Sequence, residues 1–405
     1  MPLSARSMAQ MSRLLDEALD LDEAGRRRWL GALAVEHREL ELALRQALLA
    51  EAGARKRLST LPRLDLAAGE LQSGEQVGPY ELVHQLGAGG MAQVWLAHRA
   101  DGAFEREVAL KLPMVRRPRH DLASRFAREC DILARLEHPN IAQLYDAGTT
   151  REGLHYLAME YVSGEPLVVW CDGRHLGVPE RLTLFLQVLD AVQYAHRQYV
   201  IHRDIKPSNI LVTEKGEVRL LDFGVAKLLK SDKPQAQLTQ VYGSALTPEY
   251  ASPELLRGDV VDAASDVYAL GVVLYELLAG RRPYQIKAAS AIQLRERMLL
   301  APRAKKPSAH VEPLAGAARA TTQDQLARRL KGDLDAIVLK ALARQPASRY
   351  DSATSLADDL RRYLSGEPVQ ARCDRLAYRL TRFLLQRRMG MARDRKRRHS
   401  SECQK

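Results

Sequence analysis

A change in hydrophobic periodicity near residue 165 constrains the fold of this chain more than any other feature. Segments 80–86, 93–98 and 107–112 are short and contain β-branched and aromatic residues, which is typical of strands. From about residue 165 to residue 364 the apolar residues recur at helical spacing. We therefore predict an α+β fold with two lobes, a small strand-rich lobe followed by a larger helical lobe.

Three segments surround the two predicted lobes, which together span residues 80–364. Residues 1–51 predict a helical region, because apolar residues recur there every three or four positions. Residues 52–79 contain several Gly and Pro and predict a linker, and residues 365–405 predict a basic tail. The helical region is either a docking module or an appendage that packs on the next domain, and we slightly favour the appendage.

The composition indicates a globular protein of a reducing compartment, so we expect a cytoplasmic protein. Apolar residues make up 46% and charged residues 27% of the chain. The four cysteines form no CxxC pair, which excludes a disulfide framework and a zinc ribbon. No apolar segment follows the first residues, so we expect no signal peptide. The most apolar stretch, residues 267–280, is interrupted by Glu276 and predicts a buried core helix.

The net charge of +11 is concentrated at one end of the chain. Residues 372–405 contain 12 Lys and Arg against 3 Asp and Glu, a net +9, whereas residues 1–75 contain 11 against 12, a net −1. A basic tail of this kind favours nucleic acid, anionic lipid or an acidic protein as partner. The alternative is a solvated end without a partner.

A glycine-rich turn between the first two predicted strands indicates phosphate binding. It comprises Gly87, Ala88, Gly89 and Gly90. Without a Cβ, backbone N–H groups can approach phosphate oxygens closely. A strand follows the turn instead of a helix, which excludes a dinucleotide fingerprint. Such turns are common, so this one is a weak signal by itself.

Lys111 lies at strand spacing in the apolar run Val-Ala-Leu-Lys. An ammonium group in apolar surroundings needs an anionic partner. The candidates are nucleotide phosphates and a carboxylate on the next helix, which we predict over residues 121–136. We assign Glu129 on that helix to Lys111; the alternative is that Glu129 is one more surface acid.

The most specific motif is the run His202-Arg203-Asp204-Ile205-Lys206-Pro207-Ser208-Asn209, which precedes a strand-like segment. Asp222-Phe223-Gly224 follows, and then Ala251-Ser252-Pro253-Glu254. With the glycine-rich turn, the Val-Ala-Leu-Lys run and the helix Glu, these motifs make the chain resemble a bacterial serine/threonine protein kinase of the eukaryotic-like, Hanks type. The resemblance covers residues 80–364, and six motifs in family order make a chance match very improbable.

The resemblance implies transfer of the γ-phosphate of ATP to Ser or Thr hydroxyls of a protein substrate, with Mg²⁺ or Mn²⁺ as cofactor. It implies that Asp204 orients the acceptor hydroxyl and that Lys206 balances charge near the γ-phosphate. It also implies that Lys111, oriented by Glu129, holds the α- and β-phosphates. The loop Asp-x-Lys-Pro-x-Asn resembles that of Ser/Thr kinases and differs from the loop of tyrosine kinases.

The same resemblance implies a nucleotide pocket. Asn209 and Asp222 would hold the metal through oxygen ligands, which Mg²⁺ prefers. Met159 falls at the position that guards the pocket behind adenine, and three apolar side chains would sandwich the purine ring. The implied nucleotide-binding residues are Gly87, Ala88, Gly89, Gly90, Val94, Ala109, Lys111, Met159, Glu160, Val162 and Leu211.

The resemblance also implies two structural roles and one departure. Glu254 would pair with Arg349, and Asp266 would accept hydrogen bonds from the backbone of the His-Arg-Asp run. The departure is Ala92, which stands where the family has the third glycine of its loop. One extra methyl group there is tolerable, at some cost in nucleotide affinity.

Arg203, next to the predicted base, indicates regulation by phosphorylation. An arginine at this position needs an anion to hold it, and a phosphate in the activation segment 222–254 would give it a bidentate partner. The candidate sites in this segment are Thr239, Tyr242, Ser244 and Thr247. Thr247 aligns with the threonine that contacts the catalytic loop in the family, so we predict autophosphorylation at Thr239 or Ser244.

Two questions about partners stay open in the sequence. Residues 366–372 read Gly-Glu-Pro-Val-Gln-Ala-Arg, a stretch that follows the kinase in a bacterial subgroup whose members often continue into a membrane helix. The tail either lies on an anionic membrane or is a juxtamembrane segment whose span is lost; nucleic acid is the weakest candidate, since the tail has few aromatic residues. A catalytically weak scaffold is the alternative function, but such relatives usually lose Lys111, Asp204 or Asp222.

Overall fold

The computed structural model describes residues 29–31, 71–88, 92–100, 106–113, 130, 133–150, 153–223, 248–286 and 291–372. The chain divides into a unit of residues Met1–Leu71 and a unit of residues Gln72–Lys405. Within the first unit residues 29–31 are helical, and Leu30 is buried. The rest of the predicted helical region 1–51 lies outside the described residues.

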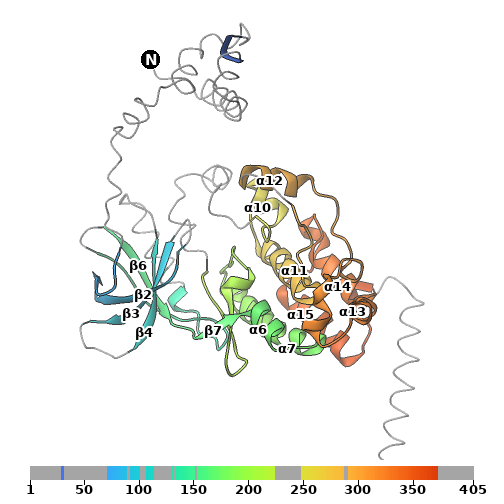
Figure 1. The fold of residues 1–405 in the computed structure, drawn as a ribbon, viewed down its shortest axis with the longest axis horizontal. Helices are drawn as coiled ribbons and strands as arrows, with labels where there is room; N and C mark the ends of the chain where they lie inside the picture. Colours follow the sequence, from blue (N-terminus) through green and yellow to red (C-terminus); the bar gives the residue numbers. More distant parts are fainter. Residues whose placement is uncertain are drawn as a thin grey trace, which may run out of the picture. The chain divides into compact units, whose positions relative to one another are not determined.

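A six-stranded antiparallel sheet forms the smaller lobe of the second unit (Figure 1). Its strands lie in the order β1-β2-β3-β4-β6-β5. The three predicted strands are confirmed as β2, β3 and β4, and alternate side chains of β4 point into the core. The bounds are β1 (Gln76–Val77), β2 (Tyr80–Ala88), β3 (Ala92–Arg99), β4 (Glu107–Pro113), β5 (Leu144–Thr149) and β6 (His155–Glu160).

The larger lobe is helical, as predicted, and carries a small antiparallel sheet of order β7-β8-β9 beside the smaller lobe (Figure 1). The short strands are β7 (Gly164–Pro166), β8 (Ile210–Thr213) and β9 (Val218–Leu220). The helices are α6 (Leu167–Gly173), α7 (Val178–Arg197), α10 (Pro253–Arg257), α11 (Ala263–Ala279), α12 (Ala291–Leu300), α13 (Gln323–Leu330), α14 (Asp333–Ala341) and α15 (Ala353–Ser365).

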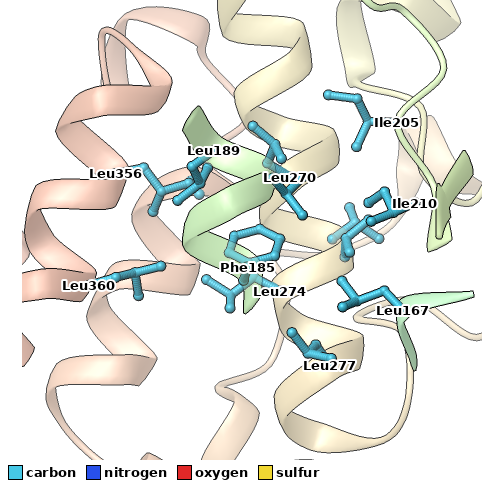
Figure 2. Close-up of a cluster of buried hydrophobic side chains, with 14 of the residues drawn as sticks. Leu167, Phe185, Leu189, Ile205, Ile210, Leu270, Leu274, Leu277, Leu356 and Leu360 are labelled. Carbon is cyan, nitrogen blue, oxygen red and sulfur yellow. The ribbon is translucent and has the colours of Figure 1, made fainter. Parts of the chain in front are cut away.

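Helix α11 runs through the centre of the larger lobe and confirms the core helix predicted over residues 267–280. Fourteen of its 17 residues are buried, which explains why it is apolar on almost every side. Asp262 caps its first turn by accepting from the Ala264 N–H at 2.9 Å, and Gly280 ends it at a φ of 77°. Leucine and phenylalanine side chains of α7 and α15 close the core around it (Figure 2).

The folded unit extends beyond residues 80–364, the predicted bounds of the kinase domain, at both ends. Strand β1 pairs with β2, and its Val77 is buried. After α15 the chain turns back, and Val369 is fully buried in the core of the larger lobe. Residues 366–372 therefore belong to the fold, although the sequence assigned them to the tail. Within the described residues, no helix is long and apolar enough to cross a bilayer.

Candidate active site

The end of β2 and the start of β3 frame the glycine-rich turn. Gly87 pairs with Val94 and Ala88 with Gln93 across the two strands. A Cβ at Gly87 would meet no other atom within 4 Å among the described residues. Gly89 and Gly90 lie outside the described residues.

Lys111 projects from β4 toward the larger lobe and meets Asp222. Its Nζ lies 2.7 Å from Oδ1 of Asp222, and the two side chains are 13% and 24% exposed. Sequence reasoning placed both residues at the nucleotide but did not pair them with each other. The predicted partner Glu129 lies outside the described residues, so its pairing with Lys111 stays a prediction.

Asp266, near the start of α11, anchors the loop that carries Asp204. Its carboxylate accepts from the His202 N–H at 2.8 Å and from the Arg203 N–H at 2.9 Å, as predicted. It also accepts from Nε2 of His196 at 2.8 Å, a contact that no sequence motif predicted. These bonds hold Arg203 at a φ of 64°, in the left-handed region that side chains other than glycine disfavour.

Burial and hydrogen bonding act on Asp266 in opposite directions. Burial alone raises the pKa of this carboxyl, but the hydrogen bonds from His196 and His202 outweigh it and hold the pKa below its ordinary value of 3.8. Asp266 is therefore ionised at neutral pH, which suits an acceptor of three hydrogen bonds.

The side chain of Asp204 is held in place by two neighbours from its own loop. Nζ of Lys206 lies 3.0 Å from its Oδ2, and Nδ2 of Asn209 donates to the same oxygen at 3.1 Å. Asn209 also donates to the Asp204 carbonyl at 2.8 Å. The carboxylate is 20% exposed, so it is both oriented and accessible to a substrate hydroxyl.

Backbone contacts of Leu221 bring Asp222 next to this loop. The Leu221 N–H donates to the carbonyl of Asn209 at 2.8 Å, and its carbonyl accepts from Nε2 of His202 at 2.8 Å. Asp222 itself has a φ of 56°, a second strained position at the site. The structure thus joins the two predicted metal ligands to the loop of Asp204.

The donor set of Asn209 and Asp222 fits a hard cation that also binds phosphate. The amide nitrogen of Asn209 donates hydrogen bonds to Asp204. The amide oxygen is therefore the atom of this side chain that can bind a cation. Among the described residues, no three His, Cys, Asp or Glu side chains form a metal cluster. An ion held by Asn209 and Asp222 would therefore take its other ligands from phosphate and water, as Mg²⁺ does.

The apolar residues predicted to hold the purine come from both lobes, from β3 and β4 in the smaller lobe and from β8 in the larger one. Ala109 pairs with Met159 on β6, and the side chains of Val94, Ala109 and Leu211 are half-buried, as is Val162 after β6. Met159 helps to line a pocket that also contains Lys111 and Asp222. Its lining comprises Lys111, Leu133, Leu136, Ile141, Ala142, Leu144, Leu157, Met159, Asp222 and Phe223.

Glu160 ends β6 at the passage from one lobe to the other. Its side chain turns away from the purine space: it accepts from the Gln143 N–H at 3.2 Å and faces Nε of Arg219 at 3.4 Å. The backbone of Glu160 pairs with Val108 on β4, and its N–H donates to the Gln143 carbonyl at 2.8 Å. The contact of Glu160 with a nucleotide stays a prediction.

A buried ion pair fixes the end of the activation segment at Glu254. Arg349 contacts Oε1 and Oε2 of Glu254 at 2.6 and 2.8 Å, which confirms the predicted pair. Nearby, the Tyr250 hydroxyl donates to Glu276 at 2.6 Å, and burial followed by this bond raises the tyrosine's pKa. Thr239, Ser244 and Thr247 lie outside the described residues.

Replacement of Asp266 by Asn is expected to lower both stability and turnover. An amide that faces two backbone N–H groups leaves one of them without an acceptor, at a cost of about 1–3 kcal/mol. The loop of Asp204 then loses its anchor, and we expect kcat to fall about tenfold or more. Urea unfolding and steady-state kinetics would measure the two effects.

Asp262→Asn is the matched control for this substitution, since Asn caps a helix as well as Asp does. The pH adds a second test. Because the folded pKa of Asp266 is depressed, its contribution to stability is present above pH 3.8 and is lost as the pH falls through the folded value. Asp266→Asn should lack this dependence; equal acid sensitivity of both proteins would contradict the role of the carboxylate.

The amino-acid sequence of this chain is similar to those of known protein kinases. A family model described as the protein kinase domain matches residues 80–359. A probable serine/threonine-protein kinase of Streptomyces coelicolor is 37% identical over 303 residues, which cover 73% of this chain and 41% of that protein. PknB, a serine/threonine-protein kinase of Mycobacterium tuberculosis, is 38% identical over 304 residues, with coverage of 72% and 44%.

Two further relatives agree with this match. The serine/threonine-protein kinase PrkC of Bacillus subtilis is 35% identical over 291 residues, which cover 70% of this chain and 40% of that protein. The crystal structure of the Mycobacterium tuberculosis PknI kinase domain aligns with a TM-score of 0.51 at 29% identity, covering 73% of this chain and 99% of that domain. The present chain thus spans less than half the length of the curated relatives that it matches.

Proposed function

Since the chain belongs to the protein kinase family, we propose that it is an active serine/threonine protein kinase that uses ATP. The observation that carries the proposal is the orientation of Asp204. Lys206 and Asn209 direct its carboxylate. Asp222 lies on the adjoining segment and contacts Lys111 of β4. The structure thus describes four of the charged groups that the family's reaction needs: Lys111, Asp204, Lys206 and Asp222.

In the proposed mechanism the protein mainly positions its substrates and stabilises charge. Asp204 accepts a hydrogen bond from the acceptor hydroxyl, orients its oxygen toward the γ-phosphate and takes its proton as the new oxygen–phosphorus bond forms. The bond between the γ-phosphorus and the oxygen that bridges to the β-phosphate breaks in the same step, and ADP leaves. Lys206 stays beside the transferred group and balances its charge. Lys111 holds the α- and β-phosphates, with Glu129 as its second partner. Asn209 and Asp222 would hold Mg²⁺ or Mn²⁺, which neutralises phosphate charge when bound.

Two further parts of the proposal concern regulation and location. Arg203 would bind a phosphate placed by autophosphorylation at Thr239 or Ser244, which would raise activity. The protein would work in the cytoplasm, where the basic segment 372–405 would attach it to an anionic membrane surface.

Phosphoamino acid analysis tests the proposed activity. Purified protein is incubated with γ-labelled ATP and Mg²⁺ beside a Lys111→Met variant, then hydrolysed. We expect labelled Ser and Thr in the unmodified protein and at most about 1% of that label in the variant, because the phosphates lose their cation. An unmodified protein that binds ATP but takes up no label, alone or with an added protein acceptor, would favour the scaffold function instead.

A further inference from the structure

The surface where the chain leaves the larger lobe is strongly basic. We call it the exit surface and define it by Lys305, Lys306, Arg328, Arg329, Lys331 and Arg372. The first five residues are exposed, and the side chain of Arg372 is 30% exposed. Helix α13 contributes one exposed acid to this region, Asp324.

Buried carboxylates at the start of α14 bring these separate segments together. Asp335 accepts from the N–H and the hydroxyl of Ser308 at 2.9 and 2.7 Å and from the Gly332 N–H at 3.3 Å. The segment after Lys306 therefore lies beside the segment after Lys331. Asp333 is 5% exposed, so its negative charge adds little to the solvent-exposed charge of the exit surface.

The motif at residues 366–372 fixes the last member of the surface. Asp359 is fully buried and accepts from the Gln370 and Ala371 N–H groups at 2.5 and 2.9 Å. Val369 is fully buried in the core of the larger lobe, and Arg372 donates to Asp333 at 2.7 Å. Three kinds of contact thus hold the point at which the basic segment starts, next to Lys331 and Gly332.

The exit surface and the segment that starts from it carry charge of the same sign. Beyond Arg372, residues 373–405 contain 11 Lys and Arg against 3 Asp and Glu, a net +8, so they cannot neutralise the exit surface. Both therefore attract the same kind of anionic partner.

We propose that the exit surface is a second, folded contact of this protein with an anionic lipid bilayer, which orients the lobe on the membrane. The inference rests on the membrane association proposed for the basic segment. Lipid is favoured over nucleic acid because Leu376, Leu380, Phe383 and other apolar residues are interspersed with arginines in that segment, a combination typical of interfacial binding. The exit surface itself supplies charge and no aromatic side chain for base stacking.

Vesicle sedimentation with three matched charge-reversal variants of the full chain tests the proposal. The first carries Lys306→Glu, Arg329→Glu and Lys331→Glu on the exit surface. The second carries Arg395→Glu, Lys396→Glu and Arg397→Glu in the basic segment. The third, a control, carries Arg135→Glu, Arg197→Glu and Lys215→Glu at exposed positions elsewhere. The vesicles contain phosphatidylcholine alone or with phosphatidylserine.

We expect the exit-surface variant to partition onto phosphatidylserine vesicles about 100-fold more weakly at 0.1 M salt, with an effect of at most about threefold in the control. Equal binding by these two variants would overturn the inference; loss of binding by the second variant would then leave the proposed tail association standing. If the unmodified protein binds vesicles with and without phosphatidylserine equally, both the inference and the proposed tail association are overturned. Weakened binding to duplex DNA with unchanged binding to vesicles would overturn the inference in favour of nucleic acid.

Discussion

Asp204→Asn is expected to lower kcat about 10³-fold, while the dissociation constant for ATP changes by less than about threefold. Asparagine keeps the size of the side chain but cannot take the proton of the acceptor hydroxyl. The loss corresponds to about 4 kcal/mol of transition-state stabilisation. Steady-state kinetics with an unstructured protein acceptor and calorimetric titration with ATP would separate the two quantities.

The matched control for this substitution is Asp190→Asn on α7. It makes the same chemical change at a carboxylate that is 67% exposed and faces His138 at 3.4 Å. We expect kcat to stay within about twofold there, because the residue touches no group of the site. An Asp204→Asn protein that keeps more than about a tenth of the unmodified kcat would rule out the assigned role of Asp204.

Arg349→Met is expected to lower the free energy of unfolding by about 3–5 kcal/mol. The guanidinium contacts both oxygens of Glu254 and donates to three backbone carbonyls, and both side chains are almost fully buried. Methionine fills much of the volume but leaves a buried carboxylate without its cation. Urea unfolding of the full chain would measure the change.

The control is Arg361→Met, which removes a partner from an ion pair that is about half-exposed, with Asp358 at 2.9 Å. Exposed pairs contribute about 0–1 kcal/mol. A double variant, Glu254→Leu with Arg349→Met, should recover part of the loss because no buried charge remains. Equal losses in Arg349→Met and Arg361→Met would contradict the importance of the buried pair.

The pH provides an independent check on the same pair. Burial raises the pKa of Glu254, but hydrogen bonds from Arg349 and Ser265 outweigh it and hold the pKa below its ordinary value of 4.5. The unmodified protein should therefore lose stability as the pH falls below 4.5 and through the folded pKa. In Arg349→Met only the hydrogen bond from Ser265 still opposes the effect of burial, so the pKa of Glu254 rises relative to the unmodified protein. The difference in stability between the two proteins should therefore narrow on acidification.

Much of the fold could be predicted from local patterns. Strands β2, β3 and β4 alternate or carry β-branched residues, and the apolar stretch of α11 is too long for a strand and too polar for a membrane span. The end of the domain could not be predicted in this way. Residues 366–372 are held by single buried contacts, such as Val369 and the carboxylate of Asp359, which leave no periodic pattern.

The residues of the site could also be predicted from the sequence, but several of their contacts could not. The motifs indicated Asp204, Asn209 and Asp222, and family resemblance indicated the anchoring by Asp266 and the pair of Glu254 and Arg349. The contact of Lys111 with Asp222 and that of His196 with Asp266 could not be predicted, since the partners lie 111 and 70 residues apart. No local rule connects positions at that separation.

The sequence by itself determined the family, the two-lobed α+β fold and the chemical types at the site, because motif order and hydrophobic periodicity are properties of the chain. Only the tertiary structure decided which charges meet: Lys111 with Asp222, and the basic residues of the exit surface with one another. The physical reason is that burial and distance govern the strength of charge interactions. Both arise when remote segments pack, so neither can be read from the order of residues.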